Sequence, residues 1–365
     1  MIKERKNIII TGTHLTPALE LIRQLQSDPK IDWQISYIGR RSNSNDVNDT
    51  SIESKIIPEL GIKFYPIYCG KFDRHYLPNT IVGIPKTIYG FFQAGRLLKK
   101  IKPEIIVSFG GYVSVPVIIN AKLNHIKTIT HEQTLTNSLT TKINSRFVDK
   151  IALSFENERQ VRELPASKIV ITGNLLRFQL FQSQPKRPQN INFKQNRLPL
   201  IYITAGNQGS HSINLCLKSI IPLLSNYNII HQTGKNDFPL FKKMNRSNSN
   251  YFASDYFSTE DFAWIINSAD LIIGRSGANT SHEIVAFSKK SILIPLPQSQ
   301  QDEQLLNALW VQKKLNRQTI IINQTDLNPK NLLTAITSLS QITASTTKTK
   351  ITPNLKLLKL IHEII

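Results

Sequence analysis

The stretch DLIIGRSGANTSHEIVAF, residues 270–287, gives the pattern that the rest of the chain repeats. Its apolar start predicts a short buried strand, residues 274–277 form a glycine turn, and helical spacing begins at Thr280. Such a turn leaves backbone N–H groups unpaired beside the positive end of a helix dipole, which favours phosphate binding. Glu283 follows one helical turn later, where a carboxylate can accept hydrogen bonds from sugar hydroxyls. The alternative is a capping box with Thr280 as the cap and Glu283 as its partner.

The same strand, glycine turn and helix start recur in three other places. NIIITGTHLTP (7–17) adds Thr16 as a candidate N-cap and Pro17 as the first helical residue. The other two places are IIVSFGGYVSVP (105–116) and LPLIYITAGNQGS (198–210). Further apolar runs predict strands at 33–39, 62–67, 127–130, 151–154, 169–172, 228–235 and 291–297. This alternation predicts an α/β fold built on doubly wound parallel sheets.

Residues 178–198 are rich in Gln, Asn, Lys and Pro, which predicts a linker between two α/β domains at 1–177 and 199–341. Two such domains imply a cleft, with ligand at the carboxyl ends of the strands. A Ser/Thr/Lys tether at 342–352 leads to an amphipathic helix at about 353–365, which we expect to pack back on the first domain.

A formal net charge of +20 predicts an anionic partner, either nucleic acid, lipid head groups or a phosphorylated substrate. A general bias towards Lys, Asn and Ile is the competing explanation. The two cysteines, Cys69 and Cys216, form no CxxC pair, so we expect neither a disulfide nor a zinc site. We find no signal peptide and no apolar run of about 20 residues, which favours a cytosolic protein that touches a membrane surface.

The segment most suited to a membrane surface is a predicted helix at 85–102, which carries Lys86, Arg96, Lys99, Lys100 and Lys102 and no acidic residue. An apolar stretch at 76–84 precedes it. Apolar residues beside a cationic helix favour an anionic membrane. A core helix with a solvated basic edge is the alternative.

No single turn is specific, but the order of the motifs is. TGTH, FGGY, HEQ, GNLLR, AGNQG, HQTGK, RSGANTSHE and QDEQLLNA together resemble the MurG family, which adds N-acetylglucosamine to lipid-linked muramyl-pentapeptide. The likeness runs from Thr11 to about Ala308. It implies a GT-B glycosyltransferase with two Rossmann-like domains, the first binding acceptor and the second binding UDP-sugar. The implied reaction is inverting transfer from UDP-GlcNAc to an undecaprenyl-linked acceptor in peptidoglycan synthesis.

The resemblance also implies the site residues and the partners. His14 matches the family histidine and is a candidate general base, or else a helix-start residue that orients its loop. His131 with Glu132 is a second candidate acid–base pair, for which a structural role competes. The implied donor-binding residues are Thr11, Gly12, Thr13, Thr134, Arg177, Asn207, Ala278, Asn279, Thr280, Ser281, His282, Glu283 and Gln304. No metal, cofactor or nucleic acid is implied, and the implied location is the anionic cytoplasmic face of the cell membrane.

The chain departs from the family pattern at three positions. TGGH is TGTH here, HEQN is HEQT, and the GSQG-like turn carries Asn207. All three lie near the implied donor or cleft, so a glycosyltransferase that makes glycosyl-diacylglycerol is the nearest alternative. A nucleic-acid binder fits less well, because aromatic residues do not alternate with basic ones. A Rossmann oxidoreductase also fits less well, because TGTHLTP is not GxGxxG.

Overall fold

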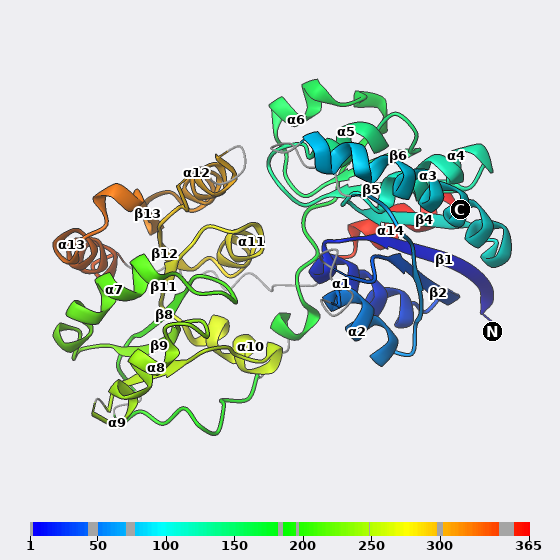
Figure 1. Ribbon diagram of the computed structural model, residues 1–365. Coiled ribbons are helices and arrows are strands. Elements are labelled where there is room, and N and C mark those ends of the chain that lie inside the picture. The colour runs from blue at the N-terminus through cyan, green and yellow to red at the C-terminus, as the bar shows by residue number, and fades with distance from the viewer. Residues whose placement is uncertain are drawn as a thin grey trace. The chain divides into compact units, whose positions relative to one another are not determined.

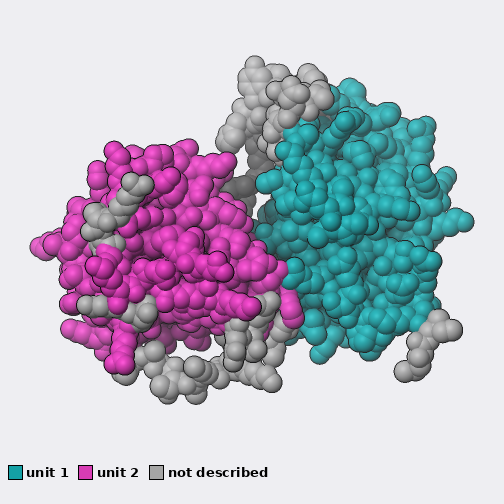
Figure 2. All heavy atoms as spheres, turned by 90° about the horizontal axis from the view of Figure 1, so that it is seen from below, with its two compact units in different colours: residues 1–175, 354–365 teal, residues 176–353 magenta. Residues whose placement is uncertain are grey.

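A computed structural model describes residues 3–42, 50–70, 77–181, 185–194, 197–247, 249–297, 302–342 and 354–365, with the backbone alone for 77–84 and 246–247. The predicted Ser/Thr/Lys tether at 342–352 lies almost entirely outside this description, and so do the side chains of the apolar stretch 76–84. The chain forms two compact units (Figure 2): unit 1 holds Met1–Leu175 and Asn354–Ile365, and unit 2 holds Leu176–Pro353.

Unit 1 contains a parallel sheet of seven strands in the order β3-β2-β1-β4-β5-β6-β7 (Figure 1). The strands are β1 Glu4–Gly12, β2 Ile31–Gly39, β3 Lys63–Pro66, β4 Ile105–Phe109, β5 Lys127–Glu132, β6 Lys150–Leu153 and β7 Ile169–Ile171. The helices are α1 Leu15–Gln26, α2 Ile52–Glu59, α3 Leu77–Ile101, α4 Ser114–Leu123, α5 Leu139–Asn144, α6 Glu158–Glu163 and α14 Lys356–Ile364, with a 3-10 turn η1 at Ala166–Lys168.

Unit 2 contains a parallel sheet of six strands in the order β10-β9-β8-β11-β12-β13. The strands are β8 Leu200–Thr204, β9 Asn228–Gln232, β10 Tyr251–Ser254, β11 Leu271–Gly274, β12 Lys290–Leu293 and β13 Thr319–Ile321. The helices are α7 His211–Ile220, α8 Phe238–Lys242, α9 Met244–Ser247, α10 Thr259–Ser268, α11 Ala278–Ala286, α12 Glu303–Leu315 and α13 Pro329–Ser340, and the 3-10 turns are η2 Phe178–Phe181, η3 Ile221–Leu223, η5 Asn316–Gln318 and η6 Gln324–Asp326.

The central residues of the inner strands are apolar and buried because helices cover both faces of each sheet. In unit 1, Ile8 and Ile10 pack with α1 and α14, whereas Ile9 packs with α3 and α4. In unit 2, Ile273 packs with α7 and α13, and Ile272 packs with α10, α11 and α12. This arrangement confirms the predicted α/β class with doubly wound parallel sheets.

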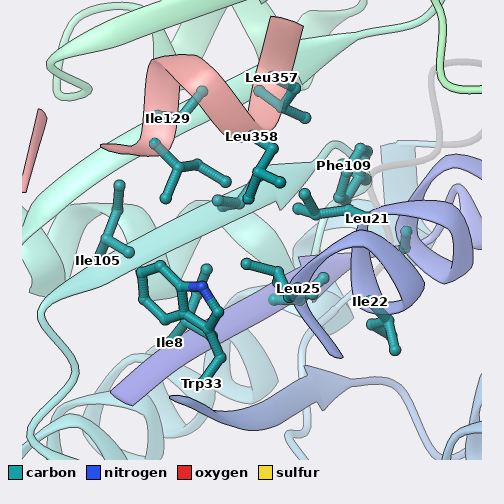
Figure 3. Packing of buried hydrophobic residues seen from close by; sticks show 14 of the residues in the cluster. Ile8, Leu21, Ile22, Leu25, Trp33, Ile105, Phe109, Ile129, Leu357 and Leu358 are labelled. Carbon is teal, nitrogen blue, oxygen red and sulfur yellow. The ribbon is translucent and has the colours of Figure 1, made fainter. Parts of the chain in front are cut away.

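The C-terminal helix α14 is part of the unit 1 core. Leu357 and Leu358 pack with Leu21 and Leu25 of α1 against the sheet (Figure 3). Asn354, just before the helix, donates its side-chain amide to the carbonyls of Thr172 and Asn174 at 2.7 and 3.0 Å. The end of the chain thus completes a face that α1 alone does not cover.

Two local predictions were wrong. α1 begins at Leu15 with His14 as N-cap, so Thr16 is the second helical residue and not a cap. The reason is that β1 continues to Gly12, which leaves only two residues for the turn. The basic helix does not begin at Pro85 either, because α3 starts at Leu77 and contains Pro85 within it. None of the described helices combines the length and apolar composition needed to cross a membrane.

We predict that Leu357→Ala destabilises the protein by about 2–5 kcal/mol, because it opens a cavity at a fully buried position of the core. Urea denaturation followed by circular dichroism measures the change. Lys359→Ala, on the exposed side of the same helix, is the control and should change the free energy of unfolding by less than about 0.5 kcal/mol. Equal midpoints for the two variants would contradict the packing of α14 in this core.

Candidate functional site

Each sheet has a switch point where the strand order reverses, and ligands of doubly wound proteins bind beside it at the carboxyl ends of the strands. In unit 1 the switch point lies between β1 and β4. Gly12 ends β1 with φ at +134°, and a Cβ atom on it would lie 2.7 Å from the carbonyl oxygen of Gly110. Thr13 donates its backbone N–H to the same oxygen at 3.2 Å. The turn after β1 therefore rests directly on the turn after β4, and only glycine allows this approach.

The side chains of Thr13 and His14 lie over the second glycine turn. A Cβ atom on Gly111 would come 2.3 Å from Thr13 Oγ1, and one on Gly110 would come 3.7 Å from His14 Cε1. His14 is half-buried, and although it is the N-cap residue of α1 its side chain makes no capping hydrogen bond. The imidazole thus lies at the ligand edge of the sheet without a role in capping the helix.

Thr11 differs from its neighbours in this loop. Its side chain is fully buried. A ligand at this edge would therefore meet Thr11 through the backbone and not through its hydroxyl.

The HEQT segment at the end of β5 is held by Glu132. One carboxylate oxygen accepts from the backbone N–H and the hydroxyl of Thr134, at 3.2 and 2.9 Å, and the other accepts from the backbone N–H of Ser138 at 3.1 Å. The Thr134 hydroxyl also lies 2.7 Å from the carbonyl of Thr136. The threonine that replaces the family asparagine is thus bonded within its own loop.

The suggested pairing of His131 with Glu132 does not form. His131 Nε2 lies 3.3 Å from Ser154 Oγ and 3.4 Å from the Gly173 carbonyl. Complete burial lowers the pKa of His131 to about 4, so the ring is neutral near pH 7. Consecutive strand residues point to opposite faces, which separates the two side chains.

In unit 2 the switch point lies between β8 and β11, and again two turns meet. A Cβ atom on Gly274 would lie 1.7 Å from the carbonyl oxygen of Thr204, and Arg275 donates its backbone N–H to that oxygen at 3.3 Å. After β8, residues Gly206 to Gly209 form a tight turn closed by a 3.3 Å bond from the Gly209 N–H to the Gly206 carbonyl. Among the described residues, the N–H groups of Asn207 and Gln208 at its centre have no hydrogen-bond partner.

Arg275 is a buried cation whose hydrogen-bond acceptors, among the described residues, are all uncharged. Its guanidinium donates to the carbonyls of Ile294 and Pro295 at 3.0 and 3.1 Å. It also donates to Ser210, Ser212 and Gln324 at 2.8, 3.1 and 2.6 Å. In the part of the chain that the structure describes, no carboxylate lies within salt-bridge distance of it. Its positive charge therefore adds to that of the α7 and α11 N-termini at this edge.

The helix after β11 starts earlier than the sequence suggested, at Ala278 with Gly277 as its N-cap. Thr280 is therefore inside the helix, and the capping-box interpretation of Thr280 and Glu283 is wrong. Glu283 instead accepts a hydrogen bond from Arg177 Nη2 at 3.1 Å. The structure thus brings together two predicted donor residues that lie 106 positions apart.

The environment of this ion pair is largely apolar. Burial raises the pKa of Glu283, and the guanidinium of Arg177 opposes that shift. Arg177 lies over the ring of Phe262, 4.6 Å from its centroid. One Glu283 oxygen thus accepts from Arg177, within a carboxylate that is almost fully buried.

The remaining predicted donor residues lie around the start of α11. Ala278, Asn279 and Thr280 are half-buried, Ser281 is fully buried, and His282 packs against Trp310 with ring centroids 4.8 Å apart. Gln304 of α12 accepts from the Leu296 N–H at 3.0 Å through its side chain, and its carbonyl accepts from Ser276 Oγ at 2.6 Å. Gln304 therefore joins the loop after β12 to the turn after β11.

Three further residues hold these turns and were not singled out from the sequence. They are Arg275, Asn307, which donates to the Ser276 carbonyl at 2.9 Å, and Gln232, which donates to the Gly206 carbonyl at 2.9 Å. Each of the three lies inside one of the motifs quoted from the sequence. Membership of a motif could therefore have marked these residues as candidates. Their acceptors are backbone carbonyls or neutral side chains, which residue spacing does not reveal.

Comparisons with known proteins agree with this geometry. Residues 8–153 match the glycosyltransferase family 28 N-terminal domain, and residues 200–363 match the glycosyltransferase family 28 C-terminal domain. A UDP-N-acetylglucosamine–N-acetylmuramyl-(pentapeptide) pyrophosphoryl-undecaprenol N-acetylglucosamine transferase of Clostridium botulinum (strain Kyoto / Type A2) is 33% identical over 335 residues, covering 90% of this chain and 89% of the relative. A protein of the same name from Clostridium kluyveri is 34% identical over 334 residues, again covering 90% and 89%.

The fold has a solved counterpart. The crystal structure of Acinetobacter baumannii MurG superimposes with a TM-score of 0.69 at 23% identity and covers 98% of this chain and 99% of that one. The two parallel-sheet units confirm the expected GT-B architecture. From the family matches and the relatives together, the chain belongs to the MurG family of N-acetylglucosamine transferases within glycosyltransferase family 28.

Proposed function

We propose that this protein transfers N-acetylglucosamine from UDP-GlcNAc to undecaprenyl-pyrophosphoryl-N-acetylmuramyl-pentapeptide, with inversion at the anomeric carbon. The observation that carries the proposal is the pair of glycine-lined switch points, in a chain 33% identical over 90% of its length to a relative that bears this activity in its name. Two phosphate-type edges suit a reaction between two diphosphate-linked substrates.

The donor is proposed to bind at the unit 2 edge. Its diphosphate would meet the free N–H groups of Asn207 and Gln208 and the N-termini of α7 and α11. The second oxygen of Glu283 would accept from the ribose hydroxyls, and Gln304 would contact the transferred sugar. As the bond from the anomeric carbon to the diphosphate breaks, these donors and the nearby Arg275 would stabilise the negative charge of departing UDP.

The acceptor is proposed to bind at the unit 1 edge. Its sugar hydroxyl would attack the anomeric carbon and pass its proton to His14, whose imidazole lies beside Gly110 and is not engaged in capping. The new glycosidic bond forms as the bond to UDP breaks. Each transfer therefore moves one proton from the acceptor hydroxyl to His14 and releases one UDP.

The proposed location is the anionic cytoplasmic face of the cell membrane. The helix α3 buries Ala94 and Leu98 in unit 1 and leaves the side chains of Ile88, Tyr89 and Phe92 more than half exposed. The exposed basic residues of the same helix are Lys86, Arg96, Lys99 and Lys100. An apolar group beside cations suits anionic lipid head groups.

A transfer assay tests the proposed reaction. The protein is incubated with UDP-GlcNAc and a prenyl-pyrophosphoryl-N-acetylmuramyl-pentapeptide, and in parallel with diacylglycerol, and the products are identified by mass spectrometry. Addition of one N-acetylglucosamine to the pentapeptide lipid is expected. Transfer to diacylglycerol alone would favour the glycosyl-diacylglycerol alternative.

We predict that Glu283→Ala weakens UDP binding by about one to two powers of ten, because hydrogen bonds to a charged carboxylate are lost. Calorimetric titration measures the affinity, and Glu260→Ala, which removes an exposed acid from α10 in the same unit, is the control. Because burial raises the pKa of Glu283, UDP affinity should also fall with decreasing pH above the usual glutamate range. Unchanged UDP affinity in Glu283→Ala would remove this residue from the donor site.

For His14→Ala we expect a loss of about 10²–10⁴-fold in turnover, the usual cost of a missing general base, with UDP affinity preserved. Initial rates at saturating substrates, together with a UDP titration, measure both quantities. The exposed His125 of unit 1 provides a matched control as His125→Asn, which tolerates the left-handed backbone there. Near-normal turnover in His14→Ala would show that another group takes the proton.

Membrane attachment should follow lipid charge. We expect flotation with vesicles that contain anionic lipid and not with neutral ones, since each basic residue near the surface contributes about 1 kcal/mol. Lys99→Glu combined with Lys100→Glu should weaken attachment, whereas Leu223→Ser, an exposed leucine of unit 2, should not. Equal flotation with both vesicle types would contradict the proposed surface.

A further inference from the structure

We infer that Gln232, the last residue of β9, is a positioning residue that holds the Gly206–Gly209 turn in the conformation that receives the donor diphosphate. The inference rests on the proposed function, since it concerns the same ligand edge. Gln232 is a buried amide next to the switch point, and the family motif HQTGK contains it.

Both ends of the Gln232 amide are bonded. Its nitrogen donates to the Gly206 carbonyl at 2.9 Å, and its oxygen accepts from the Tyr202 hydroxyl at 3.0 Å. Tyr202 is fully buried, which raises its pKa and keeps the hydroxyl protonated as a donor. The tyrosine thereby orients the amide, and the amide fixes the first residue of the turn.

The two residues after Gln232 support the other end of the turn by direct backbone contact. A Cβ atom on Gly209 would lie 2.0 Å from the Thr233 carbonyl oxygen, and one on Gly234 would lie 2.2 Å from the Gln208 carbonyl oxygen. The Gly206–Gly209 turn and the segment after β9 are in contact and cannot move closer together. The position of β9 therefore determines the position of the Asn207 and Gln208 N–H groups.

A buried network holds this end of β9 in place. The Asn214 amide nitrogen donates to the Thr233 carbonyl at 2.9 Å and to Asp237 at 2.7 Å, which leaves its oxygen to accept from His231 Nε2 at 3.0 Å. His231 therefore carries its proton on Nε2, and its Nδ1 accepts from the Tyr251 hydroxyl at 2.8 Å. Burial lowers the pKa of His231 to about 3, so this tautomer persists at neutral pH.

Tyr202 links the turn to the residues proposed to meet the ribose. Its ring centroid lies 5.8 Å from that of Phe262, and the Phe262 ring lies under the guanidinium of Arg177. The diphosphate side and the ribose side of the proposed donor site thus share one aromatic support, but only the diphosphate side depends on Gln232.

The test compares UDP with uridine in the full-length protein. Gln232→Leu removes both amide bonds, and Tyr202→Phe removes only the group that orients the amide. We expect Gln232→Leu to weaken UDP binding about tenfold by calorimetry, Tyr202→Phe to weaken it less, and uridine binding to stay within about twofold of the unsubstituted protein in both. In the transfer assay, KM for UDP-GlcNAc should rise while KM for the acceptor stays unchanged.

Ser291→Ala is the stability control, because it removes a buried hydrogen bond to Thr319 in the same sheet away from the turn. It should lower the melting temperature without changing UDP affinity. Unchanged UDP affinity in Gln232→Leu, or equal losses of affinity for UDP and for uridine, would overturn this inference and leave the proposed function standing. If the unsubstituted protein binds no UDP at all, the proposed donor fails together with the inference.

Discussion

The contact of backbone against backbone at the two switch points is the constraint on which the site depends. Parallel strands bring successive turns to one edge of each sheet, and at that edge Gly12 meets Gly110 and Gly274 meets Thr204 with no room for a side chain. Thr13 and Arg275 donate their N–H groups across these contacts, whereas the N–H groups of Asn207 and Gln208 in the next turn have no partner among the described residues. At the unit 2 edge, positive potential therefore arises from backbone groups before any charged residue is considered.

The charged residues of unit 2 then give this edge its chemistry. Arg275 supplies a cation whose acceptors are all neutral in the described part of the chain, and Glu283 supplies a carboxylate paired with Arg177. Burying an uncompensated cation costs free energy, which an anionic ligand would offset. The arrangement explains why a site for a nucleoside diphosphate can form mainly from backbone groups with few charged side chains.

The sequence predicted most of the strands, because the inner strands carry apolar runs and several of them end at glycine turns, but it missed the short edge strand β13. It predicted some helices poorly. Neither α2, capped by Ser51, nor α13, with Asn328 as N-cap and Pro329 after it, was expected, although both carry ordinary start signals. These start signals are short and follow polar segments. They therefore indicate a helix less clearly than a long apolar run indicates a strand.

In the candidate site, the spacing of residues in the sequence identified the glycine turns. It could not identify the side chains that bond to those turns or to each other. The ion pair between Arg177 and Glu283 depends on how the chain returns to the sheet after a long separation, and Gln232 acts through a carbonyl that any residue would provide. How the chain accommodates its departures from the family pattern depends on contacts between residues that are distant in the sequence or on the conformation of a loop. Thr13 packs over Gly111, and the Thr134 hydroxyl bonds within its own loop, so both substitutions are accommodated in unit 1.

The central claim is that the unit 2 edge binds UDP-GlcNAc, and a thermal-shift panel of nucleotide sugars tests it most directly. A ligand that binds only the folded protein raises its melting temperature in proportion to the logarithm of its concentration over Kd. The account predicts that UDP-GlcNAc stabilises the protein more than UDP-glucose or UDP-galactose at equal concentration, and that it does so in the presence of EDTA. Equal stabilisation by all three sugars, or none by UDP-GlcNAc, would contradict it.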